Sequence, residues 1–183
     1  LTGAAPGIGA ALAKQLRAEG KQVISVDIRD ADIIADLSME SGREDAVQQI
    51  RSRAPDGLDG FVPLAGLAAG AGHPATRMTA LNFFGAVDLA VNLKPLLARR
   101  SGAIVMVSSN SAPTSSEDDP LITPLLDGME TEALLQAKRE TGLEYMTGKR
   151  ALVYWLRRKN FEFGRDGIRI NGVAPGPIDT PMV

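Results

Sequence analysis

Short apolar runs alternate with stretches of helical periodicity along the whole chain, and this alternation restricts the possible folds more than any other feature. The runs lie at residues 23–26, 58–64, 103–107 and 168–174. They lack the polar–apolar alternation of strands with one wet face, as expected for strands covered by helices on both sides. Strands separated by helices indicate βαβ units. We therefore expect one α/β domain over residues 1–183, a Rossmann-type doubly wound parallel sheet with helices on both faces.

The helical stretches between these runs have recognisable limits. Ile8, Leu12 and Leu16 recur at helical spacing and predict a first helix that ends at residues 19–20. A second helix is expected to begin at a capping box over residues 41–44, or alternatively at Ser38. Its inward face would carry the apolar side chains that follow.

Two longer helices are expected further on, at about residues 79–99 and 143–163. Pro95 should kink the first of these or fall near its end, because proline cannot donate a helical hydrogen bond. Residues 113–142 hold three prolines, an acidic run and a short helical pattern around residues 129–139. We interpret this segment as an insertion between a strand and the next helix, not as a second domain.

The composition excludes several classes of protein. The chain is 44% apolar and its net charge is −2, so it can build a core but has no excess of basic residues for nucleic acid. No apolar run approaches the roughly 20 residues that span a bilayer, so we expect no membrane partner. With no cysteine and a single histidine, His73, a metal site is not expected. The lack of cysteine also favours a reducing, cytoplasmic setting.

The first turn of the chain has glycines at positions 3, 7 and 9, directly before the first expected helix. Glycine allows a pyrophosphate to approach the backbone closely, and the helix N-terminus offers N–H donors and the positive end of its dipole. The turn therefore predicts a dinucleotide site.

An acid at the end of the next apolar run strengthens this prediction. Asp27 lies 18 positions beyond Gly9, where a carboxylate can bind a ribose diol and would repel a 2′-phosphate. It therefore favours NAD over NADP. Arg29, two residues further on, is the competing feature, since its guanidinium group could bind the 2′-phosphate of NADP, although it could instead be solvated.

Tyr145 and Lys149 are four residues apart, hence on one face of a helix. A nearby cation stabilises a phenolate, which moves tyrosine toward the range of an acid/base at neutral pH. An isolated pair of this kind would ordinarily be an interfacial aromatic and a solvated lysine. Here Ser108 and Ser109 close a strand at the edge where ligands of parallel sheets gather, and Asn82 lies in the helical stretch after another strand.

Taken together and in order, these residues resemble the classical short-chain dehydrogenase/reductase family over essentially the whole chain. The motifs that carry the resemblance are Thr2-Gly3, Gly7-Ile8-Gly9, Asp27, Asp36-Leu37, Ala65-Gly66, Asn82, Ser109, Tyr145, Lys149 and Pro175-Gly176-Pro177-Ile178-Asp179-Thr180. Residues 27–38 and the long insertion are most similar to the bacterial 3α-hydroxysteroid dehydrogenase/carbonyl reductase branch.

The resemblance implies an NAD(H)-dependent oxidoreductase that interconverts a secondary alcohol and a ketone, the cofactor carrying the hydride. Tyr145 would transfer the proton, Lys149 would lower its pKa and bind the nicotinamide ribose, Ser109 would bond the substrate oxygen, and Asn82 would support a water relay. The implied cofactor contacts are Gly3, Gly7, Ile8, Asp27, Asp36, Leu37, Ala65, Gly66, Tyr145, Lys149, Pro175, Gly176, Ile178 and Thr180.

One motif departs from the family pattern, because Pro63-Leu64 stands where two asparagines are usual. We assign no side-chain role to either residue. The resemblance further implies a small-molecule substrate, a bulky, apolar alcohol or ketone such as a hydroxysteroid, and a homodimer or homotetramer. We expect the insertion to alter the assembly or to cover part of the substrate mouth. Leu1-Thr2 would be the tail of the first strand, at the centre of the sheet. A complete member would also add the start of that strand, a substrate loop and a last strand.

Two other functions compete with this interpretation. One is a catalytically silent NAD(H)-binding sensor or scaffold, which would have no need of Ser109, Tyr145 and Lys149 together. The other is an epimerase or dehydratase that uses the same Tyr–Lys pair, which the glycine spacing and the Pro175-Gly176 motif disfavour.

Overall fold

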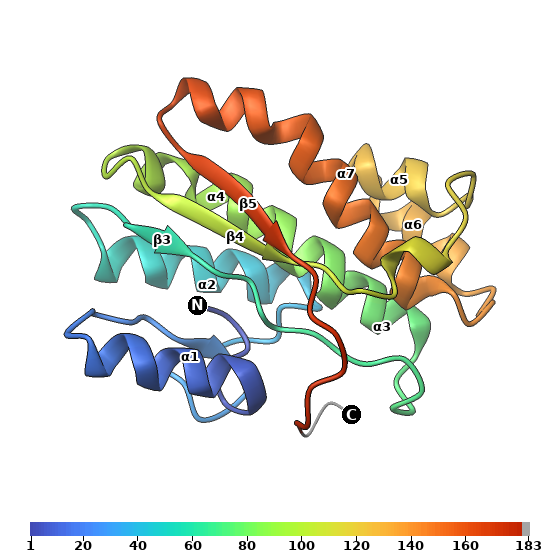
Figure 1. The fold of residues 1–183 in the computed structure, drawn as a ribbon, viewed down its shortest axis with the longest axis horizontal. Coiled ribbons are helices and arrows are strands. Elements are labelled where there is room, and N and C mark those ends of the chain that lie inside the picture. The colour runs from blue at the N-terminus through green and yellow to red at the C-terminus, as the bar shows by residue number, and fades with distance from the viewer. Residues whose placement is uncertain (181–183) are drawn as a thin grey trace.

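The computed structural model describes residues 1–180, in which parallel strands and helices alternate as an α/β fold (Figure 1). The strands are β1 (Val26–Asp27), β2 (Ile33–Ile34), β3 (Gly60–Phe61), β4 (Ala103–Val107) and β5 (Arg169–Val173). The main helices are α1 (Gly7–Ala18), α2 (Glu40–Arg53), α4 (Gly85–Ala98) and α7 (Glu144–Arg165). The predicted fold class is confirmed.

Thr2 joins two parallel ladders into one sheet. One ladder pairs β1 with β2, and the other has the order β3-β4-β5. Thr2 forms parallel bridges to Val26 on one side and to Pro63 on the other. The expectation that residues 1–2 lie at the centre of the sheet is therefore confirmed.

The chain leaves this central position in two directions, first toward β1 and β2, then toward β3, β4 and β5. Because parallel crossovers are right-handed, connections that run in opposite directions across the sheet place their helices on opposite faces of it. In Figure 1, α2 and α4 lie behind β3 and β4, α7 runs alongside β5, and α1 lies apart from them beside the N-terminus. Ligands of such folds bind where the strand order reverses, in the crevice outside the carboxyl ends of the strands.

The strands that precede the crevice are shorter than their apolar runs. The first run contributes only its last residue, Val26, to β1, the second run contributes only residues 60–61 to β3, and β2 was not predicted. β4 and β5, by contrast, pair over five residues, from Ala103 with Arg169 to Val107 with Val173. The long strand pair lies beside α7, which packs against both strands.

The helical stretch predicted for residues 79–99 begins earlier and changes type. It consists of α3 (Ala75–Thr79), a π-helical turn η1 (Ala80–Phe84) and α4, with Pro95 in the last turn of α4. Phe83 and Phe84 are 0% and 2% exposed, so they belong to the core. Residues 75–98 are long and apolar enough to cross a membrane, but 67% of that window is buried inside the protein, as in the core helix of a globular protein.

The predicted start of the second helix is wrong. The N-cap of α2 is Met39, without a side-chain cap, and Ser41 lies within the helix. Ser38 donates its hydroxyl to Asp36 instead, at 2.6 Å. The helix can begin without a cap because it packs on the preceding segment: a Cβ on Gly42 would lie 2.1 Å from the carbonyl oxygen of Asp36.

The insertion contains more regular structure than predicted. The expected helix is present as α6 (Glu130–Ala137), but a 3₁₀ turn η2 (Ala112–Thr114) and the short helix α5 (Ile122–Leu126) precede it. In Figure 1, α5 and α6 lie beside the N-terminal half of α7, with which α5 is in contact. The segment is thus part of the same packed body.

Candidate active site

The glycine turn is packed so closely that side chains are excluded from two of its positions. Gly3 has φ +69°, and a Cβ there would lie 2.5 Å from the backbone nitrogen of Ala65. A Cβ on Gly9 would lie 1.9 Å from the carbonyl oxygen of Gly3. The turn is therefore folded onto the end of β3, which brings the predicted residues Gly3 and Ala65 together.

The N-terminus of α1 can receive an anion. Its N-cap is Pro6, no side chain caps it, and its first turn has no acidic residue. Its first N–H groups therefore lack a side-chain partner and point toward the crevice end of the turn. Thr180 lies over the same turn, since a Cβ on Gly7 would be 3.3 Å from the Thr180 Cβ. Gly7 and Thr180, two of the predicted cofactor contacts, are thus neighbours.

The Pro175–Thr180 segment is tied to the end of β4. The backbone N–H of Asn110 donates to the carbonyl oxygen of Pro175 at 3.0 Å. Gly176 lies close to the Asn110 side chain, and Ile178 is 43% exposed. An exposed isoleucine in this position offers apolar surface to a ligand in the crevice.

Asp27 is held against the glycine turn. Its Oδ2 accepts the backbone N–H of Ala5 at 3.0 Å, and its Oδ1 accepts that of Ile28 at 2.7 Å. These bonds place a negative charge at the turn itself. Arg29 is exposed and makes no hydrogen bond or ion pair with any other residue in 1–180.

Asp36 and Leu37 lie just beyond the carboxyl end of β2. Asp36 accepts both N–H and O–H from Ser38 and pairs with Arg77 of α3 at 3.0 Å. Burial acts to raise the pKa of Asp36, but the Ser38 hydrogen bonds and the Arg77 charge together lower it below its ordinary value. Leu37 is 2% exposed, so its side chain belongs to the core and only its backbone is available for contact.

Asn82 clamps the segment after β3. Its Oδ1 accepts the backbone N–H of Leu67 at 2.8 Å, and its Nδ2 donates to the Leu67 carbonyl oxygen at 2.9 Å. The preceding segment is held in a similar way, because the Ala65 N–H donates to Thr2 Oγ1 at 3.1 Å. Asn82 lies in the π-helical turn, a feature frequent at functional sites, and it fixes the path of Ala65 and Gly66.

Ser109 lies just past β4, and its side chain is oriented by its own loop. Its Oγ is 2.9 Å from Ser111 Oγ and accepts the Ser111 N–H at 3.2 Å. The neighbouring Ser108 has a different partner, since its Oγ donates to the carbonyl oxygen of Lys149 at 2.8 Å. The side chain of Ser108 is therefore bonded to α7, whereas that of Ser109 is bonded only within its own loop.

Tyr145 and Lys149 are on the first turns of α7, one above the other, with Lys149 Nζ 5.7 Å from the centre of the Tyr145 ring. Lys149 is 9% exposed, and its Nζ donates to the carbonyl oxygen of Val107 at 2.8 Å. Burial lowers the pKa of Lys149 to about 8. The last residue of β4, Val107, thus holds the ammonium group next to the phenol, while Ser109 lies two residues beyond the end of that strand.

Sequence reasoning missed several residues that organise this region: Gly42, Arg77, Ser111 and Arg150. The glycine of α2 and the serine of the loop look like ordinary surface residues of their segments. The two arginines act on partners 41 and 33–38 positions away, so no local spacing reveals them. Within residues 1–180, no group of three or more His, Cys, Asp or Glu side chains could hold a metal ion.

Comparison with known proteins identifies the family. The model of the family described as short chain dehydrogenase matches residues 1–118. The chain is 36% identical, over 193 residues, to the 3-alpha-hydroxysteroid dehydrogenase/carbonyl reductase of Comamonas testosteroni, with 100% of the chain and 73% of the relative covered. This chain belongs to the short-chain dehydrogenase family.

Two further relatives agree with this assignment. The coniferyl-alcohol dehydrogenase of Pseudomonas sp. strain HR199 is 32% identical over 212 residues, covering 100% of this chain and 73% of the relative. The crystal structure of 3-alpha-hydroxysteroid dehydrogenase from Pseudomonas sp. B-0831 in complex with NADH matches 99% of this chain and 72% of that one, with a TM-score of 0.95 and 37% identity. The chain is therefore an oxidoreductase of the short-chain dehydrogenase family that acts on CH–OH groups, as its motifs predicted.

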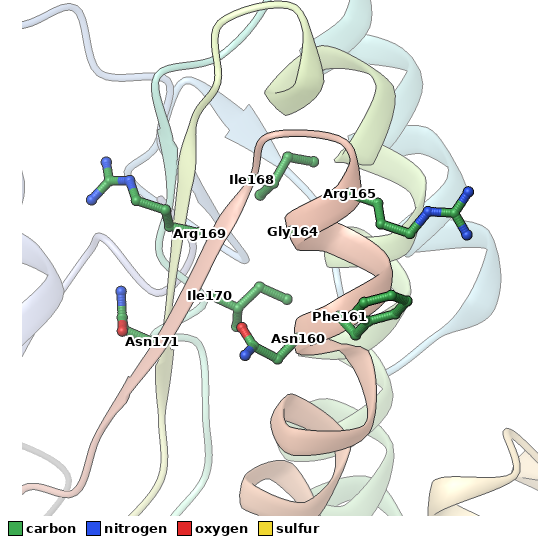
Figure 2. A pocket seen from close by; sticks show the side chains of 8 residues that line it. All are labelled: Asn160, Phe161, Gly164, Arg165, Ile168, Arg169, Ile170 and Asn171. Carbon is green, nitrogen blue, oxygen red and sulfur yellow. The ribbon is translucent and has the colours of Figure 1, made fainter.

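One hollow of this short-chain dehydrogenase lies away from these residues. It has a volume of about 610 Å³ and is lined by the last turns of α7 and by β5 (Figure 2). Phe161, Arg165 and Asn171 are among the side chains that border it. This hollow is at the amino end of β5, whereas Ser109 and Lys149 lie at the carboxyl ends of the strands, so it is not the candidate active site.

Proposed function

We propose that this short-chain dehydrogenase uses NAD(H) to interconvert a secondary alcohol and a ketone, with Tyr145 as the proton-transferring residue. The observation that carries the proposal is the attachment of α7 to the end of β4. Lys149 Nζ bonds Val107 and Ser108 Oγ bonds Lys149, so the helix that bears Tyr145 is joined to the strand end that bears Ser109. A substrate oxygen in the crevice can reach both hydroxyls only if these two elements are held together.

The residues present fit a dinucleotide. Gly3 and Gly9 admit no side chain, the N-terminus of α1 has no cap of its own, and Asp27 places a carboxylate where a ribose diol would lie. When bound, the dinucleotide supplies the group that accepts or donates the hydride. The further contacts are proposed for Gly7, Ile8, Asp36, Leu37, Ala65, Gly66, Pro175, Gly176, Ile178 and Thr180.

The chain's own residues would divide the remaining work. Tyr145 gives a proton to the substrate oxygen or takes one from it, at its phenol oxygen. Ser109 donates a hydrogen bond to the same oxygen, and Lys149 supplies positive charge beside the phenol and N–H donors to the ribose. The amide of Asn82 is committed to Leu67 on both sides, so Asn82 contributes by holding this wall of the site and through its backbone to any water relay.

Replacement of Tyr145 by phenylalanine tests the mechanism. Tyr145→Phe should lower kcat by on the order of 10²- to 10⁴-fold, because the ring stays and only the proton-carrying oxygen is lost. NADH binding, followed by the fluorescence of the cofactor, should be unchanged. The matched control is Tyr154→Phe, the same change nine residues further along α7, which should keep at least about a third of the turnover. A Tyr145→Phe enzyme with parental kcat would refute the assignment.

The preference for NAD is proposed from the charge of Asp27. A carboxylate held against the turn by Ala5 and Ile28 would repel a 2′-phosphate. Asp27→Asn keeps the shape and one acceptor oxygen but removes the charge, so the ratio of kcat/KM for NAD to that for NADP should fall by about tenfold or more. Asp30→Asn, an exposed neighbour, is the control and should leave the ratio within about twofold.

The substrate is proposed to be a hydroxysteroid or another bulky, apolar alcohol or ketone. Support comes from the relatives, which are named for a hydroxysteroid, for coniferyl alcohol and for levodione. Formation of NADH fluorescence with panels of steroid and monocyclic alcohols would rank these classes. Turnover confined to small, polar alcohols would overturn the substrate proposal and leave the reaction type standing.

A homodimer or homotetramer is proposed as the working assembly. The insertion and the residue that follows it expose three large apolar side chains, Met129, Leu135 and Leu143, at 44%, 57% and 38%. A contact between copies would cover such surface. Light scattering of the parent and of Leu135→Glu should show a smaller assembly in the variant if this face is used.

A further inference from the structure

Arg150 directly follows Lys149 on α7, and its guanidinium group is almost completely used by one short segment. Nε lies 3.3 Å from the carbonyl oxygen of Ala112 and 3.0 Å from Ser115 Oγ. Nη2 donates to the carbonyl oxygens of Pro113 and Ser115, at 3.0 and 2.8 Å. Four acceptors of this one cation therefore belong to residues 112–115, which include the 3₁₀ turn η2.

The remaining guanidinium nitrogen has partners outside the turn. Nη1 lies 2.9 Å from the Tyr154 hydroxyl oxygen and 3.1 Å from Glu117 Oε1. The Arg150 side chain is 13% exposed, whereas that of Glu117 is 78% exposed. The ion pair is thus weak in water, and the backbone carbonyls are the partners that define the position of Arg150.

The turn that Arg150 holds is continuous with the loop that orients Ser109. The N–H of Ala112 donates to the Ser109 carbonyl oxygen at 3.1 Å, and Thr114 Oγ1 donates to the Ser111 carbonyl oxygen at 2.7 Å. Ser111 in turn holds the Ser109 hydroxyl through its own Oγ and N–H. A chain of contacts thus runs from the guanidinium through η2 and Ser111 to Ser109.

We propose that Arg150 is a positioning residue that acts through η2 and Ser111 to hold the Ser109 hydroxyl at the distance from Tyr145 that the substrate oxygen requires. The inference rests on the proposed function, because it assumes that Ser109 contacts the substrate. Arg150 and Tyr145 are on one rigid helix, so whatever Arg150 grips is held in a defined place relative to Tyr145. The insertion that begins at residue 113 would otherwise leave this strand end attached to a long, irregular segment.

The planar fork of arginine is essential to this role. Arginine offers five N–H donors in fixed directions, whereas lysine offers three around a single point on a flexible stem. A lysine at position 150 keeps the charge and can keep one or two of the carbonyl contacts, but it cannot span residues 112, 113 and 115 at once. Arg150→Lys is therefore expected to fold and to loosen the loop.

A double-mutant cycle separates positioning from general stability. Arg150→Lys alone should lower kcat by about tenfold, because a displacement of about 1 Å at the reacting groups can cost up to 10²-fold, with KM for NAD unchanged within about twofold. In the Ser109→Ala background, measured by single turnover at high enzyme concentration, the same change should lower the rate by less than about twofold. An equal loss in both backgrounds, or no loss in the parent, overturns the proposal.

Hydrogen exchange gives a second readout that does not need turnover. The amides of Ser111, Ala112, Thr114 and Ser115 should exchange at least about tenfold faster in Arg150→Lys than in the parent. The matched control is Arg158→Lys, an arginine of the same helix that pairs with Asp127 of the insertion at 3.3 Å and is half exposed; its kcat and exchange should equal those of the parent. Unchanged exchange in Arg150→Lys overturns the positioning role of Arg150, even if Tyr145→Phe abolishes activity. A fully active Tyr145→Phe would refute the proposed mechanism, but it would leave the exchange result for the loop intact.

Discussion

The glycine turn (residues 3–9) and the insertion are held to the rest of the molecule by different kinds of contact. The turn is built from backbone pressed against backbone, as Gly3 and Gly9 show, and from amides bonded to Asp27. The insertion is held by arginine side chains that reach it from α2 and α7. The first kind of contact restricts the residue type at each position, so its pattern can be read along the chain, whereas the second depends on partners that are distant in sequence.

Arg43 is the clearest anchor of the insertion. It is 3% exposed, and its Nε lies 2.7 Å from Asp88 of α4 while its Nη2 bonds Glu130 of α6. Its Nη1 also lies 3.4 Å from the Leu37 carbonyl oxygen, beside the proposed cofactor contacts. Burial raises the pKa of Asp88, and the opposing charge of Arg43 limits that rise.

The largest predicted effect is the loss of this anchor. Arg43→Leu should lower the free energy of unfolding by up to about 3–5 kcal/mol, since it removes a buried cation that pairs with two partly buried carboxylates, those of Asp88 and Glu130. Urea denaturation measures the change. Arg100→Leu removes a pair with Asp59 that is exposed on both sides and should cost less than about 1 kcal/mol. Equal losses in the two variants would mean that burial does not distinguish the insertion's anchor from a surface pair.

The next effect concerns Lys149, on the helix where the two regions meet. A lysine whose pKa falls from 10.5 to about 8 on folding binds its proton less tightly in the folded state. The folded protein therefore carries a penalty below pH 8 that disappears as the pH rises to 10.5, where both states are neutral. The full difference is about 3 kcal/mol.

Lys149→Met removes the titration, so the stability of the parent relative to this variant should rise by up to about 3 kcal/mol between pH 8 and 10.5. Denaturant titrations at several pH values provide the measurement. Lys159→Met, at an exposed site on the same helix, should run parallel to the parent. A constant offset between parent and Lys149→Met across this range would show that burial of Lys149 does not disfavour its charge.

The third prediction tests the backbone packing of the turn. A Cβ on Gly9 would collide with the Gly3 carbonyl oxygen, so Gly9→Ala should cost about 2–3 kcal/mol and weaken NADH binding at least about tenfold. Gly164 also lies within a helix, but a Cβ there meets nothing within 4 Å. Gly164→Ala should instead stabilise the protein by about 0.5–1 kcal/mol. Thermal unfolding of the two variants would therefore move in opposite directions.

The same contrast explains what could be predicted from the sequence. The α/β class, the central place of Thr2, the helices α1 and α7 and the helix α6 of the insertion follow from periodicity and from the motif order. β2 could not be predicted, because two residues carry no period. The capping box at residues 41–44 was wrong because packing of Gly42 on Asp36 overrides local capping preference.

Among the site residues, Gly3, Gly7, Asp27 and Thr180 lie together around the turn. Their roles in binding, like those of Asn82, Ser109, Tyr145 and Lys149 in catalysis, stay predictions. The positions that could not be found from the sequence, above all Arg43 and Arg150, are ordinary charged residues in helical stretches. Only the fold brings their partners, up to 87 positions away, within hydrogen-bond distance.

The smallest effect is expected where a charge pair does occur at the cofactor-facing side. Arg77 and Asp36 are 46% and 38% exposed, so Arg77→Ala should change the free energy of unfolding by less than about 1 kcal/mol at pH 7. The pKa of Asp36 should nevertheless rise when the charge is removed, because Arg77 is one of the groups that lower it. NMR titration of the Asp36 carboxyl would detect that rise.

A carboxyl with a lowered pKa favours the folded state above its normal titration range and loses this contribution as the pH falls. The stability of Arg77→Ala should therefore differ from that of the parent less at acidic pH than at pH 7. If Arg77→Ala were as damaging as Arg43→Leu, ion pairs would hold both regions equally, and the division between backbone packing at the turn and buried charge at the insertion would be wrong.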